Sequence, residues 1–116
     1  MRKISRNDCV ILPLVLKKRW YDMIDSGVKK EEYREYKDFW IKRIDKWQNS
    51  RYVELIPHLE YKIDVIAFSC GYKKPDMFFV CDYIFLIEGT PKHPEWGEPN
   101  IRHFSLGLGE RIEVVD

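Results

Sequence analysis

The chain has 116 residues, of which 45% are hydrophobic, 15% aromatic and 34% charged. This length suits one domain spanning residues 1–116, and the composition is that of a globular protein rather than a disordered tail. Because 20 basic residues face 19 acidic ones, the net charge of +1 excludes a global positive field that would attract duplex DNA or an anionic membrane. Any contact with nucleic acid must therefore be local.

Residues 9–16 are aliphatic and β-branched, which predicts a buried first strand. From residue 17 to 26 apolar side chains recur at helical spacing, and Gly27 follows where a helix end favours a left-handed residue. The polar residues 29–36, with interleaved tyrosines, predict a second strand. Asp38 is then expected to cap a second helix that runs to about residue 48.

The second half of the chain reads as strands and loops. Residues 49–62 are expected to form a loop around Pro57, and residues 88–100 form another, rich in proline and glycine. Strands are predicted over residues 63–68, 77–87 and 103–115, the last of them bent by glycines. Four or five strands with two early helices predict a mainly β fold, a small and partly closed mixed β-barrel.

Three cysteines, Cys9, Cys70 and Cys81, are odd in number and far apart, with no C-x-x-C pair. This pattern argues against a disulfide framework and against a zinc site, and it predicts reduced thiols in the cytoplasm. The apolar run at residues 9–16 is interrupted by Pro13 and is too short to span a membrane. We therefore expect no metal, no cofactor and no membrane association.

The sharpest pattern is the spacing G-x-K-x-x-E-x-R, formed by Gly27, Lys29, Glu32 and Arg34. Four fixed residues at ordinary usage match by chance in about one chain of this size in a thousand. Glu32 and Arg34 share one face of a strand, so a pocket there would offer one acceptor and a planar fork of donors to a base edge or a phosphate. The structural alternative is that these two side chains pair with each other or across strands while Lys29 is solvated.

Lys29 has a second possible role. Burial and the neighbouring Lys30 would lower its pKa, which would let it act as a base or as an oxyanion partner in acyl transfer. If the protein is an enzyme, Lys29 and Glu32 are therefore the candidate catalytic pair.

The G-x-K-x-x-E-x-R spacing resembles the signature of the ASCH domain family, which belongs to the PUA-like β-barrel superfamily. The tail supports this resemblance, because residues 94–99 read PEWGEP and the segment FSLGLGE, which starts at Phe104 in the closing strand, follows, as in some ASCH proteins. The resemblance covers nearly the whole chain. It implies a PUA-like pseudo-barrel that binds RNA or modified nucleosides.

One branch of that family resembles acetylcytidine amidohydrolases, which remove an acyl group from a cytosine nitrogen. In that branch a nucleophilic threonine occupies the position of Glu32, so the glutamate in this chain favours binding over catalysis. The family also has a carboxylate farther along the chain, for which Glu60, Asp64 and Asp82 are candidates.

Aromatic residues complete the expected ligand site. Trp96 lies in the Pro/Gly loop and is expected either to cover the pocket by stacking or to anchor the loop on the barrel. Tyr72 is a second candidate for stacking, and Trp20 is expected in the core beneath the motif or on the pocket wall.

Other nucleophiles and metal ligands are weaker candidates. Ser69 and Cys70 follow a predicted strand, where a nucleophile can be exposed, but no histidine lies near them in sequence. His58, His93 and His103 are isolated, without the spacing of metal ligands.

Three functions are consistent with the sequence. The first is a domain that binds RNA or a nucleotide-like ligand through the motif, and the second is a small hydrolase acting on an acylated nucleoside or on RNA. The third is a protein-interaction module in which the charged turn is only a solvated rim. The oligomeric state is not predicted.

Overall fold

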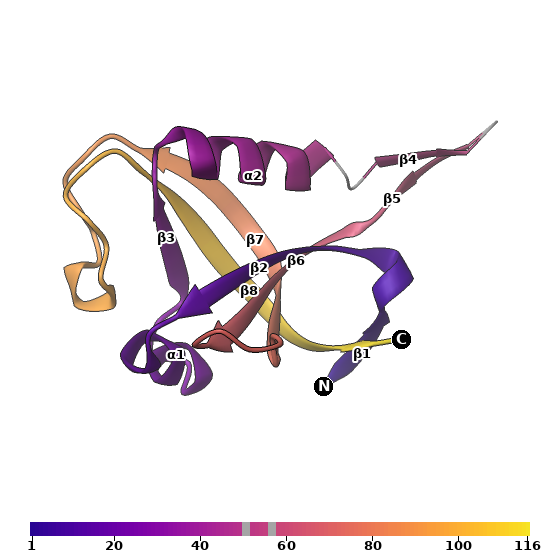
Figure 1. Ribbon diagram of the computed structural model, residues 1–116, viewed down its shortest axis with the longest axis horizontal. Helices are drawn as coiled ribbons and strands as arrows, with labels where there is room; N and C mark the ends of the chain where they lie inside the picture. The colour runs from indigo at the N-terminus through magenta and orange to yellow at the C-terminus, as the bar shows by residue number, and fades with distance from the viewer. Residues whose placement is uncertain (50–51, 56–57) are drawn as a thin grey trace.

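A computed structural model describes residues 1–49, 52–55 and 58–116 of the chain, with side chains described for residues 1–49 and 62–116. It contains the strands β1 (Arg2–Ser5), β2 (Cys9–Leu16), β3 (Glu31–Glu35), β4 (Tyr52–Leu55), β5 (His58–Tyr61), β6 (Ile63–Cys70), β7 (Met77–Ile87) and β8 (His103–Val115) (Figure 1). The helices are α1 (Lys18–Asp25) and α2 (Asp38–Asn49), and short 3₁₀ turns cover Arg6–Asp8 and Pro94–Trp96. No helix among these described residues has both the length and the apolar character that crossing a membrane requires.

The main sheet is organised around β8, which is 13 residues long. One edge of β8 pairs antiparallel with β7, and the other edge is shared by β3 at residues 103–107 and by β1 at residues 112–115. The strand order is β1-β8-β7-β6-β2, with β3 on β8 and with β2 parallel to β6. The domain is therefore mainly β with two helices in its first half, as the sequence predicts.

The six-stranded sheet is not closed into a barrel, so the prediction of a partly closed barrel needs correction. In the described part of the chain β2 and β3 share no backbone ladder. Instead a side chain bridges them, because Arg34 on β3 donates from Nη2 to the carbonyl of Val15 on β2 at 3.3 Å. The backbone ladder of β3, five residues long, is formed with β8 alone among the described strands.

The two helices pack on the sheet through short apolar faces. Ile24 of α1 and Ile44 and Trp47 of α2 are buried in one hydrophobic cluster with side chains of β2, β6 and β8. The Trp47 indole donates to the carbonyl of Val10 on β2 at 2.9 Å, which fixes α2 over that strand. Figure 1 shows β3 running from α1 to α2, so the two helices lie at opposite ends of this strand.

Two elements differ from the sequence prediction. Residues 52–55 and 58–61 form the antiparallel hairpin β4–β5 rather than a loop, while Pro57, the residue on which the loop prediction rested, lies outside the described residues. Polar and apolar side chains alternate with a period of two in His-Leu-Glu-Tyr and in the Val-Glu-Leu part of the first segment, which is the strand signal that the prediction overlooked. The strand β1 was also not predicted, because four residues with one buried side chain give little signal.

Element boundaries agree closely elsewhere. The predicted strands 77–87 and 103–115 are confirmed as β7 and β8. β6 extends to Cys70, so Ser69 and Cys70 lie within a strand rather than after it. Asp38 is not the cap of α2, because the N–H groups of Trp40 and Ile41 donate to the carbonyl of Lys37, the residue before it. The carboxylate of Asp38 lies in the first turn of α2, where its negative charge interacts favourably with the helix dipole.

Candidate functional site

A cleft of about 1110 Å³ opens between α1, the free edge of β2, β3, the start of α2 and the loop that carries Trp96. Its aromatic lining residues are Trp20, Tyr33, Phe39, Trp40, Tyr72 and Trp96. Its cationic lining residues are Lys17, Lys18, Lys29, Arg34 and Arg43. Glu32 is the one carboxylate among the described residues of the lining, so positive charge is in excess here.

Lys29 is the most buried of these cations, with 1% of its side chain exposed. Its Nζ lies 3.1 Å from Oε1 of Glu32, donates a hydrogen bond to the carbonyl of Trp96, and lies 4.7 Å from the centre of the Tyr33 ring. Burial lowers the pKa of Lys29, the Glu32 carboxylate opposes that shift, and the nearby Arg34 guanidinium adds to it. Lys29 therefore holds its proton less tightly than an exposed lysine does.

The lowered pKa agrees with the direction predicted from the sequence, but one predicted cause is wrong. Lys30 is exposed and takes no part, and the second cation that acts on Lys29 is Arg34. The alternative in which Lys29 is solvated is also wrong, because its side chain is enclosed.

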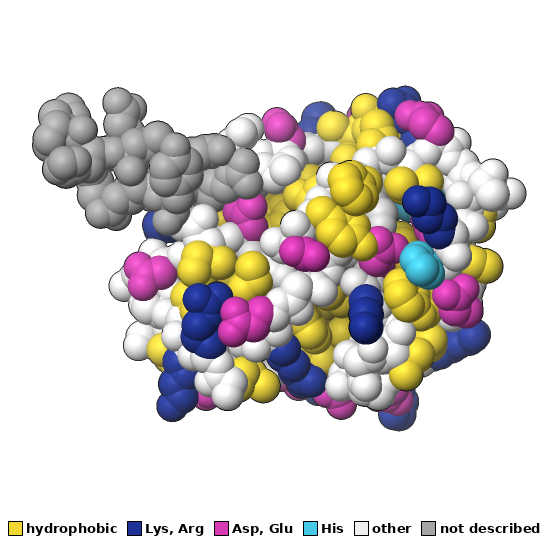
Figure 2. Space-filling view, turned by 180° about the vertical axis from the view of Figure 1, so that it is seen from behind, with side chains coloured by type: hydrophobic (Ala, Val, Ile, Leu, Met, Phe, Trp, Pro, Cys, Tyr) yellow, Lys and Arg dark blue, Asp and Glu magenta, His cyan; other side chains and the backbone are white. Residues whose placement is uncertain are grey.

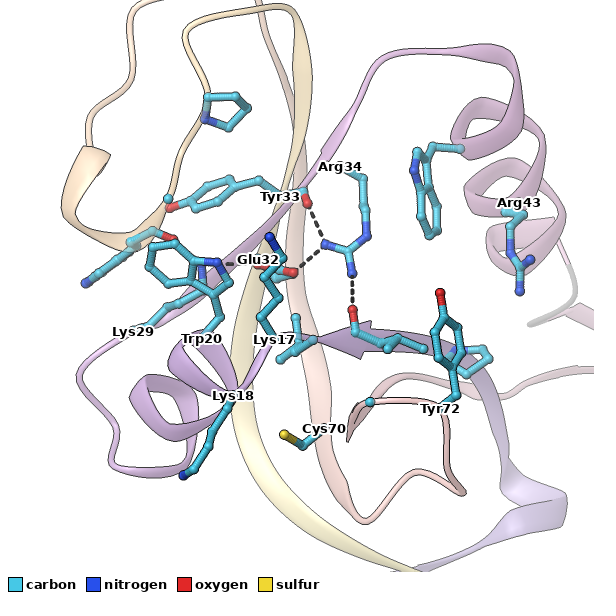
Figure 3. Close-up of a pocket in the computed structure, with 18 of the residues that line it drawn as sticks. Lys17, Lys18, Trp20, Lys29, Glu32, Tyr33, Arg34, Arg43, Cys70 and Tyr72 are labelled. Atoms are coloured by element: carbon cyan, nitrogen blue, oxygen red, sulfur yellow. Dashed lines mark hydrogen bonds and ion pairs between the residues drawn. The ribbon is translucent and has the colours of Figure 1, made fainter.

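Glu32 accepts from two cations at once (Figure 3). Its Oε1 faces Lys29, and its Oε2 accepts from Nη1 of Arg34. Arg34 also donates to the carbonyl of Tyr33 at 2.6 Å and to that of Val15 at 3.3 Å, which fixes the guanidinium plane against β2. The pairing of Glu32 with Arg34 is therefore real, and it forms the floor of the cleft together with Lys29.

The balance of charge leaves a net attraction for anions. Lys29 and Arg34 together outweigh Glu32 by one positive charge, while Lys18 is paired with Asp22 at 2.6 Å. Among the described side chains no carboxylate forms an ion pair with Lys17, which lines the same cleft. On the face seen in Figure 2, basic and acidic side chains are interspersed with hydrophobic ones, so the positive excess is a local property of the cleft.

Aromatic rings line both ends of the cleft. At the α1 end the Trp96 ring stacks on His93 with centroids 4.0 Å apart and planes 15° apart. At the α2 end the Trp40 ring lies 5.0 Å from the guanidinium carbon of Arg34, and Tyr72 is 99% exposed. Figure 3 shows Trp20 and Lys29 at one end, Tyr72 and Arg43 at the other, and Glu32 and Arg34 between them. Aromatic rings that line a cleft in this way can stack on nucleobases.

The loop that carries Trp96 is held by a buried carboxylate. Glu98 accepts hydrogen bonds from the backbone N–H groups of Lys92 and His93 and from Nε2 of His103, each at 2.8 Å. Burial raises the pKa of Glu98, but these three donors outweigh it and hold that pKa below its usual range. The loop is thereby fixed at the position that brings the carbonyl of Trp96 to Lys29.

Gly97 explains how this loop approaches α1 so closely. Its φ is +83°, and a Cβ at this position would lie 2.8 Å from Cζ2 of Trp20. A side chain there would displace the Trp20 ring, so glycine meets both the left-handed backbone and the close contact.

A second buried carboxylate, Glu31, lies on the opposite face of β3 from Glu32 because adjacent strand residues alternate. The Tyr33 hydroxyl donates to Glu31 at 2.9 Å, and the Tyr83 hydroxyl donates to its other oxygen. Burial, reinforced by these bonds to Glu31, raises the pKa of both tyrosines. Nε2 of His93 lies 4.0 Å from Oε1 of Glu31, so this network also supports the imidazole ring on which Trp96 stacks.

The structure brings most of the predicted site residues together. Lys29, Glu32, Arg34, Tyr72 and Trp96 all line the cleft. Trp20 also lines it, which answers the choice between core and pocket wall in favour of the wall.

Gly27 is not part of the lining. It has a φ of +82° and donates from its N–H to the carbonyl of Ile24 at 3.1 Å, so its role is to end α1 and turn the chain toward β3. Its place in the G-x-K-x-x-E-x-R spacing is therefore structural.

The other carboxylates proposed from the sequence do not join the site. Asp64 on β6 and Asp82 on β7 are not among the residues that line the cleft, and the side chain of Glu60 lies outside the described residues. In their place the structure puts Glu31 and Glu98 behind the lining. The doublet Glu31-Glu32 in a polar strand was the available signal for one of them.

Ser69 and Cys70 gain no catalytic partner. The Ser69 hydroxyl is buried and donates to the carbonyl of Gly71 at 2.9 Å, while Cys70 lines the cleft beside Tyr72. No histidine is among the described residues of the lining. Within the described residues, moreover, no three His, Cys, Asp or Glu side chains are grouped so as to hold a metal ion.

The sequence prediction missed the α2 wall of the cleft. Phe39, Trp40 and Arg43 lie at positions i, i+1 and i+4 of α2 and face the cleft, whereas Ile44 and Trp47 face the core. The sequence signal for this wall was the aromatic pair Phe39-Trp40, which lies about one helical turn before Arg43.

Comparisons of the chain with protein-family models, with curated protein sequences and with solved structures gave no match. The chemistry of the cleft is therefore the basis for assigning a function.

Proposed function

We propose that this chain is a PUA-like domain of the ASCH type that binds RNA or a nucleotide-like ligand in the cleft. The observation that carries the proposal is the lining itself, in which five cations and six aromatic rings surround one carboxylate. A nucleotide presents an anionic phosphate and a flat base, and this lining offers a partner to each. The order of elements, with the G-x-K-x-x-E-x-R spacing between the two helices, agrees with the ASCH pattern.

The residues of the cleft have distinct roles in this proposal. Trp20 and Trp96 stack on the base at the α1 end, and Lys17 and Arg34 bind the phosphate as charged donors. A carboxylate has about four lone-pair sites, so Glu32 keeps acceptor capacity for an amino group of the base after binding Lys29 and Arg34.

Isothermal titration with uridine and adenosine monophosphates at low salt tests this assignment. Arg34→Ala is expected to weaken binding about ten- to a hundredfold, corresponding to about 1–3 kcal/mol for one charged contact. Arg111→Ala is the matched control, because Arg111 also pairs with a carboxylate, Asp25 at 2.8 Å, but does not line the cleft. Equal affinities for wild type and Arg34→Ala would refute the assignment.

A specific observation also favours a second candidate function, hydrolysis. Lys29 is a buried lysine with a lowered pKa, and its Nζ lies 3.1 Å from a carboxylate in the same cleft. In this scheme Glu32 accepts a proton from water, the resulting hydroxide attacks an acyl carbon or a phosphorus, and the Lys29 ammonium protonates the leaving nitrogen or oxygen.

Incubation with acetylcytidine and with end-labelled single-stranded RNA tests for hydrolysis. An enzyme is expected to release acetate or shortened RNA, and to lose turnover in Lys29→Met and in Glu32→Gln. A bell-shaped pH profile that persisted in Glu32→Gln would exclude Glu32 as one of its two groups. Binding without turnover would exclude hydrolysis and support the first candidate function, nucleotide binding.

A further inference from the structure

A second hollow, of about 550 Å³, adjoins the cleft along β2 and beneath α2. It is lined by Val10, Ile11, Leu12, Pro13, Arg43, Lys46 and Trp47. Pro13 and Arg43 line both spaces, so the cleft and the hollow adjoin along the free edge of β2, and together they are called the track below.

Arg43 stands at the junction of the two spaces. Its side chain is exposed on α2, and its guanidinium carbon lies 5.1 Å from the Phe39 ring and 5.9 Å from the Trp40 ring. Among the described side chains no carboxylate forms an ion pair with Arg43. A guanidinium held by aromatic rings and without a carboxylate partner is suited to an external anion such as a phosphate.

The track has more volume than one nucleotide requires. Pockets of about 300–1,000 Å³ enclose a whole drug-sized ligand, and the cleft alone, at about 1110 Å³, already exceeds this range before the hollow is added. Along the track the charged groups alternate with rings: Lys29 with Trp20 at one end, Arg34 in the middle, then Trp40 and Arg43. This alternation is the pattern with which proteins bind a single strand, whose successive phosphates and bases need alternate partners.

We propose that the site takes a single-stranded oligonucleotide rather than a free nucleotide, with one base at the Lys29–Glu32 end and the backbone crossing Arg43 into the second hollow. This inference rests on the proposed function, since it requires that the cleft bind a nucleotide. Bases in a duplex have no free faces for Trp20, Trp40 and Tyr72 to stack on, so the strand must be unpaired.

A length series separates this inference from the proposed function. Affinities of uridine mono-, di-, tri- and hexanucleotides are measured at low salt by fluorescence anisotropy competition. For wild type we expect the trinucleotide to bind at least tenfold more tightly than the mononucleotide. Arg43→Ala should bring the ratio of these two affinities close to one. It should also reduce the slope of log affinity against log salt concentration for the trinucleotide by the amount expected for the loss of about one phosphate contact.

Lys42→Ala is the matched control, because Lys42 is an exposed cation on the same helix and lines neither space. It should leave the ratio of affinities unchanged. Far-UV circular dichroism checks that α2 is intact in both variants, and since alanine favours helix we expect no loss.

The outcomes are distinguishable. If the mononucleotide binds and the trinucleotide binds no better, the second hollow is not used, the inference is overturned and the proposed function stands. If the ratio survives Arg43→Ala or falls equally in Lys42→Ala, the track does not cross Arg43. A hairpin duplex that binds as tightly as the single strand also overturns the inference, and failure of every oligonucleotide to bind refutes the proposed function itself.

Discussion

Replacing Glu32 by glutamine removes a charge that two cations share while keeping the shape of the side chain. The Lys29 ammonium is 3.1 Å from Oε1, and at an effective dielectric constant of about 20 this contact alone is worth about 5 kcal/mol before desolvation. The glutamine would leave Lys29, with 1% of its side chain exposed, next to the guanidinium of Arg34 without a compensating charge. We expect a loss of about 3–5 kcal/mol in the free energy of unfolding, the usual cost of breaking a buried pair.

Urea unfolding followed by far-UV circular dichroism measures this loss, and the m-value should not change. For a chain of this length the loss corresponds to a decrease of roughly 10–20 °C in Tm. Glu35→Gln is the matched control on the same strand, because Glu35 pairs with Lys37 at 3.7 Å and both side chains are more than half exposed. This control should stay within about 0.5 kcal/mol of wild type.

The pH dependence gives the prediction a second readout. The folded pKa of Lys29 lies below 10.5, so the unfolded chain binds more protons between that folded pKa and 10.5, and stability must rise with pH across this window. In Glu32→Gln the pKa of Lys29 falls further, which widens the window toward lower pH. A Glu32→Gln variant as stable as Glu35→Gln at neutral pH would refute the argument that this buried charge network supports the fold.

Three further predictions concern the surroundings of the cleft. Gly27→Ala and Gly97→Ala both force a left-handed alanine, with φ of +82° and +83°, but only at Gly97 would the Cβ meet Trp20, at 2.8 Å. We expect the free energy of unfolding, measured in urea, to fall by about 1–2 kcal/mol for Gly27→Ala and by about 2–5 kcal/mol for Gly97→Ala. Equal losses in the two variants would contradict the contact with Trp20. The pKa of Glu98 lies below 4.5, so the stabilising effect of its carboxylate is complete above pH 4.5 and is lost as the pH falls through the folded pKa. In Glu98→Gln the free energy of unfolding should therefore depend less on pH in the acid range. Glu95→Gln, on the exposed side of the same loop, should leave that dependence unchanged. The hydrogen bond to Asp76 raises the pKa of Tyr21 to about 12, and NMR titration of Asp76→Asn should return it toward 10.0; an unchanged value would show that Asp76 is not the cause.

The sequence was informative where periodicity runs over many residues. β7 and β8 have 11 and 13 residues, and their apolar patterns predict them with correct bounds. The short strand β1 was missed because its pairing partner is the far end of β8, where Arg2 lies opposite Ile112. No local pattern reports a contact between the two ends of a chain.

The same distinction holds for the site. Lys29, Glu32 and Arg34 lie within six residues, so their spacing along the chain could be interpreted as a shared site. The carbonyl of Trp96 that binds Lys29 is 67 residues away along the chain, and its position depends on the buried Glu98. Arg43 was not among the predicted site residues, because only the packing of α2 over β2 shows that its face of the helix borders the cleft.

The central claim is that a nucleotide occupies the cleft, and the four tryptophan indoles test it most directly. Trp20, Trp40 and Trp96 line the cleft, whereas Trp47 is 5% exposed and its indole N–H is bonded to Val10 at 2.9 Å. When uridine monophosphate is added, we predict shifts of the indole N–H signals of Trp20 and Trp96 in a proton–nitrogen correlation spectrum, a smaller shift for Trp40, and none for Trp47. Unchanged signals from Trp20 and Trp96 at saturating nucleotide would contradict the claim.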